Sequence, residues 1–347
     1  STGVPKGVRI PHSGLANYLG WAVAAYGMTA GDAAPVQSPL SFDFTLTPLL
    51  TPLLAGGEVV LLDEADGVEG LGRMLAKRSG FGLMKLTPAH LEVLLRTVPA
   101  DRLRDACRVL VVGGDALPTA LARRWLRAAP NTRMVNEYGP TEAVVGCCVH
   151  DVSYEDTGRV TVPIGRPVAG TRLLVVADGR PAPDGAVGEL WIGGDQVAAG
   201  YLDDPEQTAA RFVTDAEGAR WYRTGDRVRR LATGDLEYLG RSDRQLKVRG
   251  YRVEPGEVEA ALLDHPTVRE AVVVPTGRDG LAGYVAGGDP TELRAFLSAR
   301  LPSYLVPDVL VPLGELPLTA NGKVDLAALP DLGAHRPRAT YEPPRPG

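Results

Sequence analysis

The sequence predicts an α/β protein with a large core, a small β-rich part and a second, smaller α+β domain. Three observations lead to this prediction. Strand-like and helix-like segments alternate with short connections between Glu58 and Asn136, which is typical of a parallel sheet covered by helices. Around Pro163 the pattern changes to short strands separated by Gly, Pro and Asp. After Gly250, helices and strands alternate again over a shorter stretch.

The length and composition agree with more than one domain. The chain has 347 residues, of which 44% are hydrophobic, so a sizeable core is expected. We place a large part at 1–240, with its β-rich portion at about 163–240, and a small α+β domain at 241–332. Residues 333–347 are rich in Pro and are predicted to be a linker towards a further domain.

The helix predicted at 13–25 illustrates how the elements are assigned. Its residues Leu15, Tyr18, Leu19 and Ala22 fall on one helical face, and its first residue, a serine, is a suitable N-cap. The same reasoning predicts helices at 68–77, 88–98, 117–129, 255–263 and 291–301. It predicts strands at 58–62, 82–86, 108–112, 132–136, 171–177, 188–192, 221–224, 235–239, 268–275 and 308–312.

Charge and cysteine usage argue against several classes of function. The formal net charge is −5 and the pI is about 5.7, which argues against nucleic acid or an anionic membrane as the main partner. No apolar run reaches transmembrane length, and no signal peptide is recognisable. Cys107, Cys147 and Cys148 are odd in number and lack metal-ligand spacing, so a reduced cytoplasmic protein is expected.

The first eight residues, Ser1–Val8, are small and glycine-rich and include Lys6. Backbone N–H groups of such a loop can hold phosphate oxygens, and Lys6 adds a positive charge. The spacing is not the Walker pattern, and a flexible glycine-rich terminus is the alternative. Because a phosphate loop normally follows a strand, we expect that a preceding part of the chain is missing here or lies elsewhere.

The stretch Asn136–Ala143 combines several groups that suit nucleotide chemistry. It follows an apolar strand and turns at a Gly-Pro pair, which puts Thr141 and Glu142 at the carboxyl end of a strand, where open α/β sheets bind ligands. Thr141 offers a hydroxyl to phosphate, Glu142 offers a hard oxygen to Mg²⁺, and Tyr138 offers a flat face to a base. An ordinary turn followed by a helix start is the alternative.

Two further carboxylates have more than one interpretation. Asp43 lies in an otherwise apolar and hydroxyl-bearing stretch, so it either caps the following helix or pairs with a cationic ligand. Asp226 is expected at the end of a strand, as a ribose-binding acid or as a turn carboxylate. The charged segment Gly240–Gly250 is either a hinge or a solvated loop, and Lys323 projects from an Asn-Gly turn.

Together these stretches resemble the adenylation domains of non-ribosomal peptide synthetases, within the ANL superfamily of adenylate-forming enzymes. The segments that carry the resemblance follow the family's order and are Ser1–Val8, Asn136–Ala143, Gly188–Leu190, Ala199–Leu202, Tyr222–Asp226, Gly240–Gly250, Leu301–Pro307 and Leu318–Asp325. The resemblance implies the ANL fold without its N-terminal part, because the family has further chain before the phosphate loop. Ala320 stands where the family commonly has Pro.

The resemblance implies a two-step reaction. ATP and an amino acid give aminoacyl-AMP and pyrophosphate, and the acyl group then passes to the phosphopantetheine thiol of a carrier domain. The implied catalytic residues are Lys6, Thr141, Glu142 and Lys323, with Glu142 on Mg²⁺, Thr141 on the α-phosphate and Lys323 between the substrate carboxylate and that phosphate. The implied nucleotide-binding residues are Thr2, Gly3 and Lys6 for the β- and γ-phosphates, Gly113, Gly114 and Tyr138 for adenine, and Asp226 and Arg241 for ribose. Asp243 is implied as the hinge of the small domain.

The family's amino-acid pocket falls on Asp43, Phe44, Thr47, Lys85, Val111, Gly113, Glu137, Val145, Gly146 and Lys323. Asp43 would pair with the substrate ammonium. Lys85 and Glu137 suit a primary carboxamide, because Lys85 donates to its oxygen and Glu137 accepts from its NH₂. The set also resembles the pattern of asparagine-activating domains, so asparagine is expected, followed by aspartate, glutamine and β-hydroxyasparagine. A mutual pair of Lys85 and Glu137 is the alternative.

Two other functions stay open at this point. An acyl- or aryl-CoA ligase is disfavoured by Asp43 and by the Pro-rich linker. A truncated, non-catalytic scaffold is disfavoured because Lys6, Glu142, Asp226 and Lys323 are all present. The expected partners are a downstream carrier domain and other synthetase domains, and the sequence leaves open whether an MbtH-like protein is needed.

Overall fold

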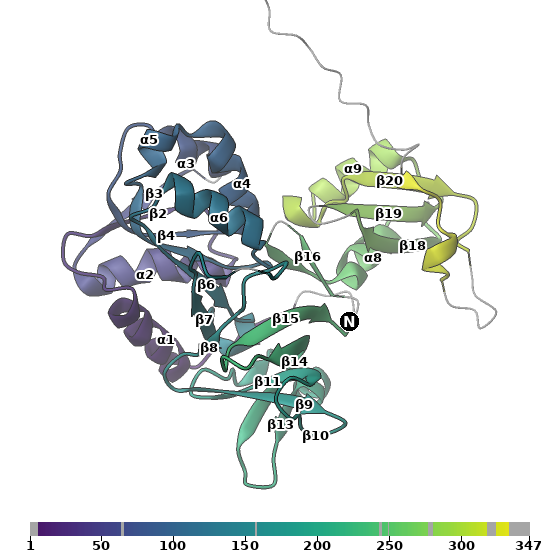
Figure 1. The fold of residues 1–347 in the computed structure, drawn as a ribbon. Helices are drawn as coiled ribbons and strands as arrows, with labels where there is room; N and C mark the ends of the chain where they lie inside the picture. The colour runs from purple at the N-terminus through teal and green to yellow at the C-terminus, as the bar shows by residue number, and fades with distance from the viewer. Residues whose placement is uncertain are drawn as a thin grey trace, which may run out of the picture. The chain divides into compact units, whose positions relative to one another are not determined.

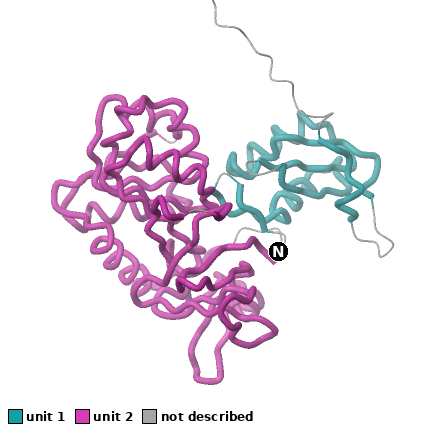
Figure 2. The backbone as a smooth tube through the Cα atoms, in the orientation of Figure 1, with its two compact units in different colours: residues 1–5, 244–347 teal, residues 6–243 magenta. Residues whose placement is uncertain are grey.

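The computed structural model describes residues 6–63, 66–156, 158–242, 245–248, 250–276, 280–317 and 324–332. The chain divides into two compact units, one from Lys6 to Asp243 and one from Arg244 onward (Figure 2). We call them the large unit and the small unit. Their α/β and α+β architectures are those that the sequence predicts.

A five-stranded sheet forms the core of the large unit (Figure 1). Its strands, in spatial order, are β4 (Phe81–Leu86), β5 (Cys107–Val112), β6 (Arg133–Tyr138), β7 (Cys148–Asp151) and β8 (Arg166–Pro167). The first three are parallel, as predicted, whereas β7 and β8 are antiparallel. The parallel sheet predicted between Glu58 and Asn136 is therefore found in β4, β5 and β6, whereas the strand predicted at 58–62 lies outside this sheet. The strands β7 and β8 come after the predicted stretch, and a connection without a crossover helix makes β7 antiparallel to β6.

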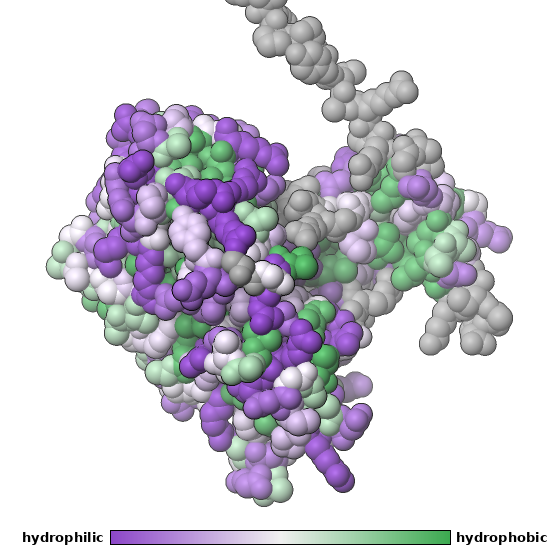
Figure 3. Space-filling view, in the orientation of Figure 1, coloured by the Kyte–Doolittle hydropathy of each residue, from purple (hydrophilic) through white to green (hydrophobic). Residues whose placement is uncertain are grey.

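Helices cover both faces of this sheet. One face, which includes Met84 and Leu110, packs on α3, α4 and α6, and the other face, which includes Leu83 and Val109, packs on α1 and α2. The helices are α1 (His12–Ala25), α2 (Leu46–Ala55), α3 (Gly67–Leu75), α4 (Pro88–Thr97), α5 (Ala100–Leu103) and α6 (Thr119–Ala128). Beside them, β2 (Ala33–Val36) and β3 (Glu58–Leu61) form a parallel pair. Hydrophilic side chains cover much of the viewed outer surface of this unit (Figure 3).

The helix α1 buries the predicted face, since Tyr18, Leu19 and Ala22 are nearly inaccessible to solvent. Its predicted cap is wrong: Pro11 occupies the N-cap position, and Ser13 lies within the first turn and makes no cap bond. Proline suits this place because its fixed φ is compatible with the start of a helix.

The β-rich portion of the large unit is a six-stranded antiparallel sheet in the order β10-β9-β11-β14-β13, with β15 also paired to β14. Its strands are β9 (Thr171–Ala177), β10 (Arg180–Pro181), β11 (Val187–Gly194), β13 (Phe212–Thr214), β14 (Arg220–Arg230) and β15 (Leu236–Arg241). Helix α7 (Pro205–Arg211) precedes β13, and β12 (Gly200–Tyr201) pairs with β1 (Val8–Arg9).

The position expected for Asp226 requires a correction. Asp226 lies within the long strand β14, not at its end. Gly225, with φ of 75°, and a register shift between Asp226 and Val228 let the strand continue through a bulge. The Thr-Gly-Asp sequence has the composition of a turn, but pairing of β14 with β11 and β15 keeps it within the strand.

The small unit contains a three-stranded sheet in the order β18-β19-β20, with two helices packed on one face, and a separate antiparallel pair of β16 and β17. It contains β16 (Leu246–Val248), β17 (Tyr251–Val253), α8 (Pro255–Leu263), β18 (Glu270–Pro275), β19 (Leu281–Ala286), α9 (Pro290–Ser298) and β20 (Val309–Leu313). The sequence prediction missed β19, the fully buried central strand.

Short 3₁₀ helices occur in both units. They are η1 (Asp43–Thr45) and η3 (Thr141–Ala143) in the large unit, and η4 (Ser303–Leu305) and η5 (Leu326–Ala328) in the small unit.

Two composition-based expectations have structural counterparts. The three cysteines are buried, and none of them forms a disulfide, in agreement with the reduced state that the sequence predicts. None of the helices in the described part of the chain has the length and apolarity needed to cross a membrane.

Candidate active site

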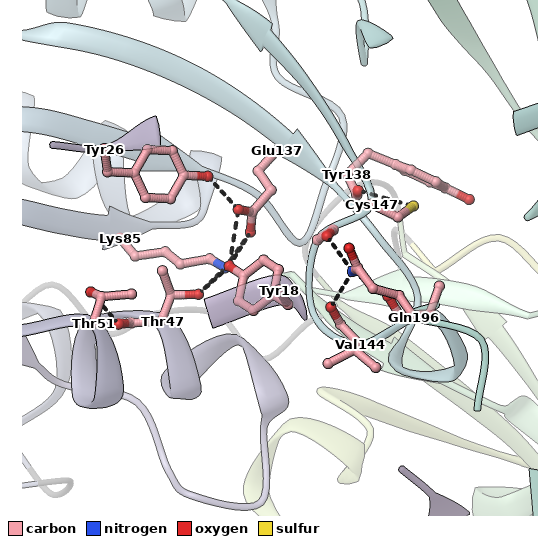
Figure 4. A network of polar contacts seen from close by, with 12 residues as sticks. Tyr18, Tyr26, Thr47, Thr51, Lys85, Glu137, Tyr138, Val144, Cys147 and Gln196 are labelled. Carbon is pink, nitrogen blue, oxygen red and sulfur yellow. Dashed lines mark hydrogen bonds and ion pairs between the residues drawn. The ribbon is translucent and has the colours of Figure 1, made fainter. Parts of the chain in front are cut away.

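Lys85 and Glu137 meet inside the large unit although they come from different strands (Figure 4). Lys85 lies on β4 beside Val111 of β5, and Glu137 lies near the end of β6. The Lys85 ammonium donates directly to the Glu137 carboxylate and also to the Thr47 hydroxyl at 2.8 Å. Its Nζ atom is 4.7 Å from the centre of the Phe44 ring. The tertiary structure thus brings together five of the predicted pocket positions.

Two tyrosines complete the surroundings of Glu137. Tyr26 donates to Oε2 at 2.5 Å, and Tyr18 donates to the same atom at 3.1 Å. The Tyr18 and Thr47 hydroxyl oxygens are 2.6 Å apart. Because the one Tyr18 proton goes to Glu137, Thr47 is the donor in that bond. Lys85, Thr47, Tyr18 and Glu137 therefore form a closed ring of hydrogen bonds (Figure 4).

This network is withdrawn from solvent, since Lys85 is 1% exposed and Glu137 is 5% exposed. Burial, followed by the charge of Glu137, raises the pKa of Tyr18 and of Tyr26 well above the usual value. Both hydroxyls therefore keep their protons and remain donors at neutral pH. The alternative of a mutual Lys85–Glu137 pair is the arrangement found in this structure.

Asp43 does not cap the helix that follows it. It begins η1, while Thr45 occupies the N-cap position of α2 without a side-chain cap bond, so the capping interpretation of Asp43 is not realised. Its Oδ2 atom is buried and has no hydrogen-bond partner among the described residues. Burial raises the pKa of Asp43, and the Thr141 hydroxyl and the Lys85 ammonium oppose this shift. An unsatisfied buried carboxylate oxygen is well suited to a cationic ligand.

A cavity of about 150 Å³ lies next to this carboxylate. Its walls include Asp43, Thr141 and Val145, with apolar side chains that include Leu15 and Leu46. Lys85 and Glu137 are not among the residues that line it. The cavity therefore joins the predicted ammonium-binding residue to the predicted phosphate-binding residue.

Gly113 and Gly146 lie close to the glutamate. A side chain at Gly146 would overlap the Glu137 carboxyl group, and one at Gly113 would lie 2.9 Å from the Glu137 carbonyl oxygen. Both positions therefore need glycine for space. Gly114, which follows β5, has a φ of 84° and thus a backbone that favours glycine.

Thr141 and Glu142 lie in η3, directly after the turn that ends β6. Glu142 is buried, and Tyr201 donates to its Oε1 at 2.6 Å. The pairing of β1 with β12 brings Lys6 near the same tyrosine, with Nζ 5.7 Å from the centre of the Tyr201 ring. The predicted phosphate-binding residues Lys6 and Thr141 thus belong to segments that flank Glu142.

The surroundings of Glu142 are compatible with Mg²⁺. Among the described residues there is no group of three or more His, Cys, Asp or Glu side chains arranged around a metal position. Mg²⁺ commonly takes one or two carboxylates and completes its shell with phosphate oxygens and water. Glu142 with the neighbouring Thr141 hydroxyl is a donor set of this kind.

Tyr138, Asp226 and Arg241, which are predicted to bind adenine and ribose, contact one another. Tyr138 donates its hydroxyl proton to Asp226, and Arg241 donates to the other carboxylate oxygen at 2.6 Å. Asp226 and Arg241 are directly opposite each other on β14 and β15. Burial, followed by the charge of Asp226, raises the pKa of Tyr138 well above its usual value, so Tyr138 remains a donor.

The chain matches two family models. Residues 1–202 match the family model described as AMP-binding enzyme, and residues 257–323 match the AMP-binding enzyme C-terminal domain. The chain belongs to the AMP-binding enzyme family.

Relatives of this AMP-binding enzyme include peptide synthetases. Tyrocidine synthase 3 of Brevibacillus parabrevis is 41% identical over 341 residues, which are 95% of this chain and 5% of that protein. Bacitracin synthase 3 of Bacillus licheniformis is 41% identical over 360 residues, which are 99% of this chain and 6% of that protein. The chain therefore spans only a small part of the length of these relatives.

Solved structures of adenylation domains are similar to this chain. An NRPS protein containing adenylation and PCP domains is 32% identical with a TM-score of 0.79, over 94% of this chain and 58% of that chain. The Vibrio cholerae adenylation domain AlmE, solved with glycyl-adenosine-5'-phosphate, is 26% identical with a TM-score of 0.79, over 93% of this chain and 63% of that chain. The predicted resemblance to adenylation domains of peptide synthetases and the predicted fold class are confirmed.

Four predicted site residues of this adenylation domain, Thr2, Gly3, Asp243 and Lys323, lie outside the described residues. Their roles remain predictions. Conversely, the sequence pattern indicates only packing for Tyr18 and no role for Tyr26, whereas both donate to Glu137. A tyrosine on the buried face of a helix needs a partner for its hydroxyl, and this rule is the signal that points to Tyr18.

Proposed function

We propose that this adenylation domain activates an α-amino acid with ATP, giving aminoacyl-AMP and pyrophosphate, and that the acyl group passes to a carrier-domain thiol. The observation that carries the proposal is the buried, unpartnered Oδ2 of Asp43 in the cavity that Thr141 also lines. The α-ammonium group of an amino acid supplies the missing partner. The α-carboxylate, attached to the same carbon, then lies towards Thr141 and the phosphate-binding residues.

In this mechanism the amino-acid carboxylate oxygen attacks the α-phosphorus of ATP. The new oxygen–phosphorus bond replaces the bond to the bridging oxygen, and pyrophosphate leaves with that oxygen. Asp43 orients the amino acid, and the Thr141 hydroxyl donates to an α-phosphate oxygen. Lys6 offsets the negative charge of the outer phosphates. Lys323 would bridge the two reacting groups.

Glu142 would hold Mg²⁺, which on binding neutralises phosphate charge. Tyr201, which donates to Glu142, fixes the orientation of that carboxylate. Asp226 would accept bonds from the ribose hydroxyls while Arg241 keeps it ionised and in place. Tyr138 would stack on adenine, beside the Gly113–Gly114 backbone.

For the side chain of the substrate we propose asparagine. Lys85 uses two of its three N–H groups within the described residues, on Thr47 and Glu137, so one remains for an amide oxygen. Glu137 would accept from the amide NH₂, whereas it would repel the carboxylate of aspartate. Entry of the amide requires Phe44 to move, since its ring lies beside the Lys85 ammonium.

A second candidate is an amino acid with a small apolar side chain. The closed Lys85–Glu137 pair and the apolar wall formed by residues such as Leu15, Leu46 and Val145 favour it. In that case the ion pair is purely structural and the side chain occupies the cavity beside Asp43.

Amino-acid-dependent ATP–pyrophosphate exchange tests these proposals on the full-length protein that contains this chain. Exchange that is strongest with asparagine supports both the reaction and the amide site. Exchange with an apolar amino acid keeps the reaction and rejects asparagine. Turnover that requires CoA favours the acyl- or aryl-CoA ligase. Folded protein that exchanges with no amino acid, with its partner proteins present, favours the scaffold.

A further inference from the structure

The loop after Glu142 contains two consecutive residues in a rare backbone conformation. Val144 has a φ of 54° and Val145 has a φ of 64°. Left-handed backbone is uncommon in residues other than glycine, and it is least favourable for β-branched side chains such as valine. Such strain persists only where the surrounding structure holds it. Val144 and Val145 both line the cavity beside Asp43, so the strain lies at the pocket itself.

Gln196 is the side chain that holds this loop (Figure 4). Its Nε2 atom lies 3.0 Å from the Ala143 carbonyl oxygen, 3.2 Å from that of Val144 and 2.9 Å from that of Gly146. The two N–H hydrogens of this group are thus shared among three carbonyl oxygens, of the residue before the strained valines, of the first valine and of the residue after them. Gln196 is 0% exposed, so these bonds are shielded from solvent.

The orientation of the Gln196 amide is also determined. Its Oε1 atom accepts from Asn17 Nδ2 of α1 at 3.0 Å and from Thr171 Oγ1 of β9 at 3.0 Å. Donors on one side and carbonyl oxygens on the other leave only one orientation of the amide satisfied. A glutamate at this position would instead place an oxygen against the three carbonyl groups.

A backbone bond close to Gln196 also holds Glu142, the residue directly before this loop. The Ala198 N–H donates to the Glu142 carbonyl oxygen at 2.9 Å. The segment 196–198 therefore contacts both the Mg²⁺-binding candidate Glu142 and the loop that lines the amino-acid cavity. In the predicted pocket, Val145 and Gly146 lie within this held loop.

We propose that Gln196 is a positioning residue of the amino-acid pocket. It fixes the Val144–Val145 backbone in the left-handed conformation and so sets where Val145 faces the substrate. The role in substrate recognition rests on the proposed function. The effect of Gln196 on the loop backbone is independent of the proposed function. The positioning role and the proposed function can therefore be tested separately.

The test compares Gln196→Met with the parent in the full-length protein. Methionine has a similar shape but cannot donate to the three carbonyls. Thr132→Val is the matched control, because it also removes a buried side-chain bond to a carbonyl, from Thr132 Oγ1 to Cys107 at 2.8 Å, away from the loop. Thr171→Val is a milder variant that keeps the glutamine and removes one bond to its oxygen, in case Gln196→Met does not fold.

In ATP–pyrophosphate exchange, Gln196→Met is expected to raise the KM for the amino acid about tenfold or more, with a much smaller change in the KM for ATP. It is also expected to change the ratio of rates between competing amino acids, whereas Thr132→Val changes neither. Thr171→Val is expected to act in the same direction by a smaller factor. Unchanged amino-acid KM and selectivity in folded Gln196→Met, or in folded Thr171→Val, would overturn the proposal.

A crystal structure of a Gln196 or Thr171 variant gives a readout that does not need activity. Positive φ at both valines in folded Gln196→Met would overturn the positioning role, even where the parent shows no exchange with any amino acid. Relaxation of Val144 or Val145 to negative φ is the expected result. Absence of exchange in the parent would count against the proposed function only.

Discussion

The Lys85 ammonium and the Glu137 carboxylate form a buried ion pair that closes a ring of hydrogen bonds with Thr47 and Tyr18. Taking two charges out of water is costly, and only direct contact and further hydrogen bonds offset that cost. The pair therefore makes each charge depend on the other for its place in the fold.

Replacement of only one of these two charged residues should destabilise the fold more, relative to what it removes, than replacement of both. Lys85→Met or Glu137→Gln alone is expected to lower the free energy of unfolding by about 3–5 kcal/mol, because the remaining charge or polar group is left unpaired. The double variant should be clearly more stable than the sum of the two losses predicts. Urea unfolding of all four proteins measures the coupling. A matched cycle on the exposed pair Arg96 and Glu92, 3.0 Å apart, should give at most about 0.5 kcal/mol. Additive losses at Lys85 and Glu137 would contradict the account.

Asp43→Asn should separate binding of the amino acid from binding of ATP. Loss of the negative charge leaves the substrate ammonium unpaired, so kcat/KM for the amino acid is expected to fall about a hundredfold, with little change in ATP affinity. Exchange kinetics and equilibrium ATP binding measure the two quantities. An equal loss in both would instead indicate a general disturbance of the large unit.

The pH dependence of the parent should carry the signature of Asp43. Burial raises the pKa of this carboxyl, and only the ionised form pairs with an ammonium group. Activity should therefore fall as pH drops through a value above the ordinary range for aspartate, and this limb should be absent in Asp43→Asn. Since the folded pKa is raised, the folded state binds a proton more tightly than the unfolded state, and the contribution of Asp43 to stability falls as pH rises. Asp43→Asn is thus expected to melt higher than the parent at neutral pH, and a lower melting temperature would contradict this.

Tyr26→Phe tests the outer support of Glu137. It removes a 2.5 Å bond to a buried carboxylate and is expected to cost about 1–3 kcal/mol of stability. If Glu137 contacts the substrate amide, the preference for asparagine over aspartate should also decrease. Urea unfolding and the ratio of exchange rates measure these effects, with Tyr154→Phe, at an exposed tyrosine, as the control. An unchanged ratio of the exchange rates with asparagine and aspartate would show that Glu137 does not select the substrate.

Asp226→Asn should weaken the binding of ATP. The carboxylate accepts from Tyr138 and Arg241, and its replacement by an amide is expected to raise the KM for ATP about tenfold or more. The KM for the amino acid should change little. Asp151→Asn, which breaks an exposed pair with Arg133, is the control and should leave both values unchanged. A larger effect on the amino acid than on ATP would argue against the ribose assignment.

The sequence alone determined the fold class, most of the described α-helices, about half of the described strands, and the family. These features depend on local patterns: α8 was predicted at its observed bounds, and the Thr141–Glu142 motif was recognisable from its own residues. Tertiary structure decided which polar groups become partners. Tyr26 and Glu137 are 111 residues apart, and Gln196 reaches a loop about fifty residues earlier in the chain. Asp226 looked like a turn residue until pairing with two neighbouring strands kept it in β14. Hydrophobic periodicity is a property of neighbouring residues, whereas a hydrogen bond between distant side chains exists only once packing has brought them within reach and excluded water.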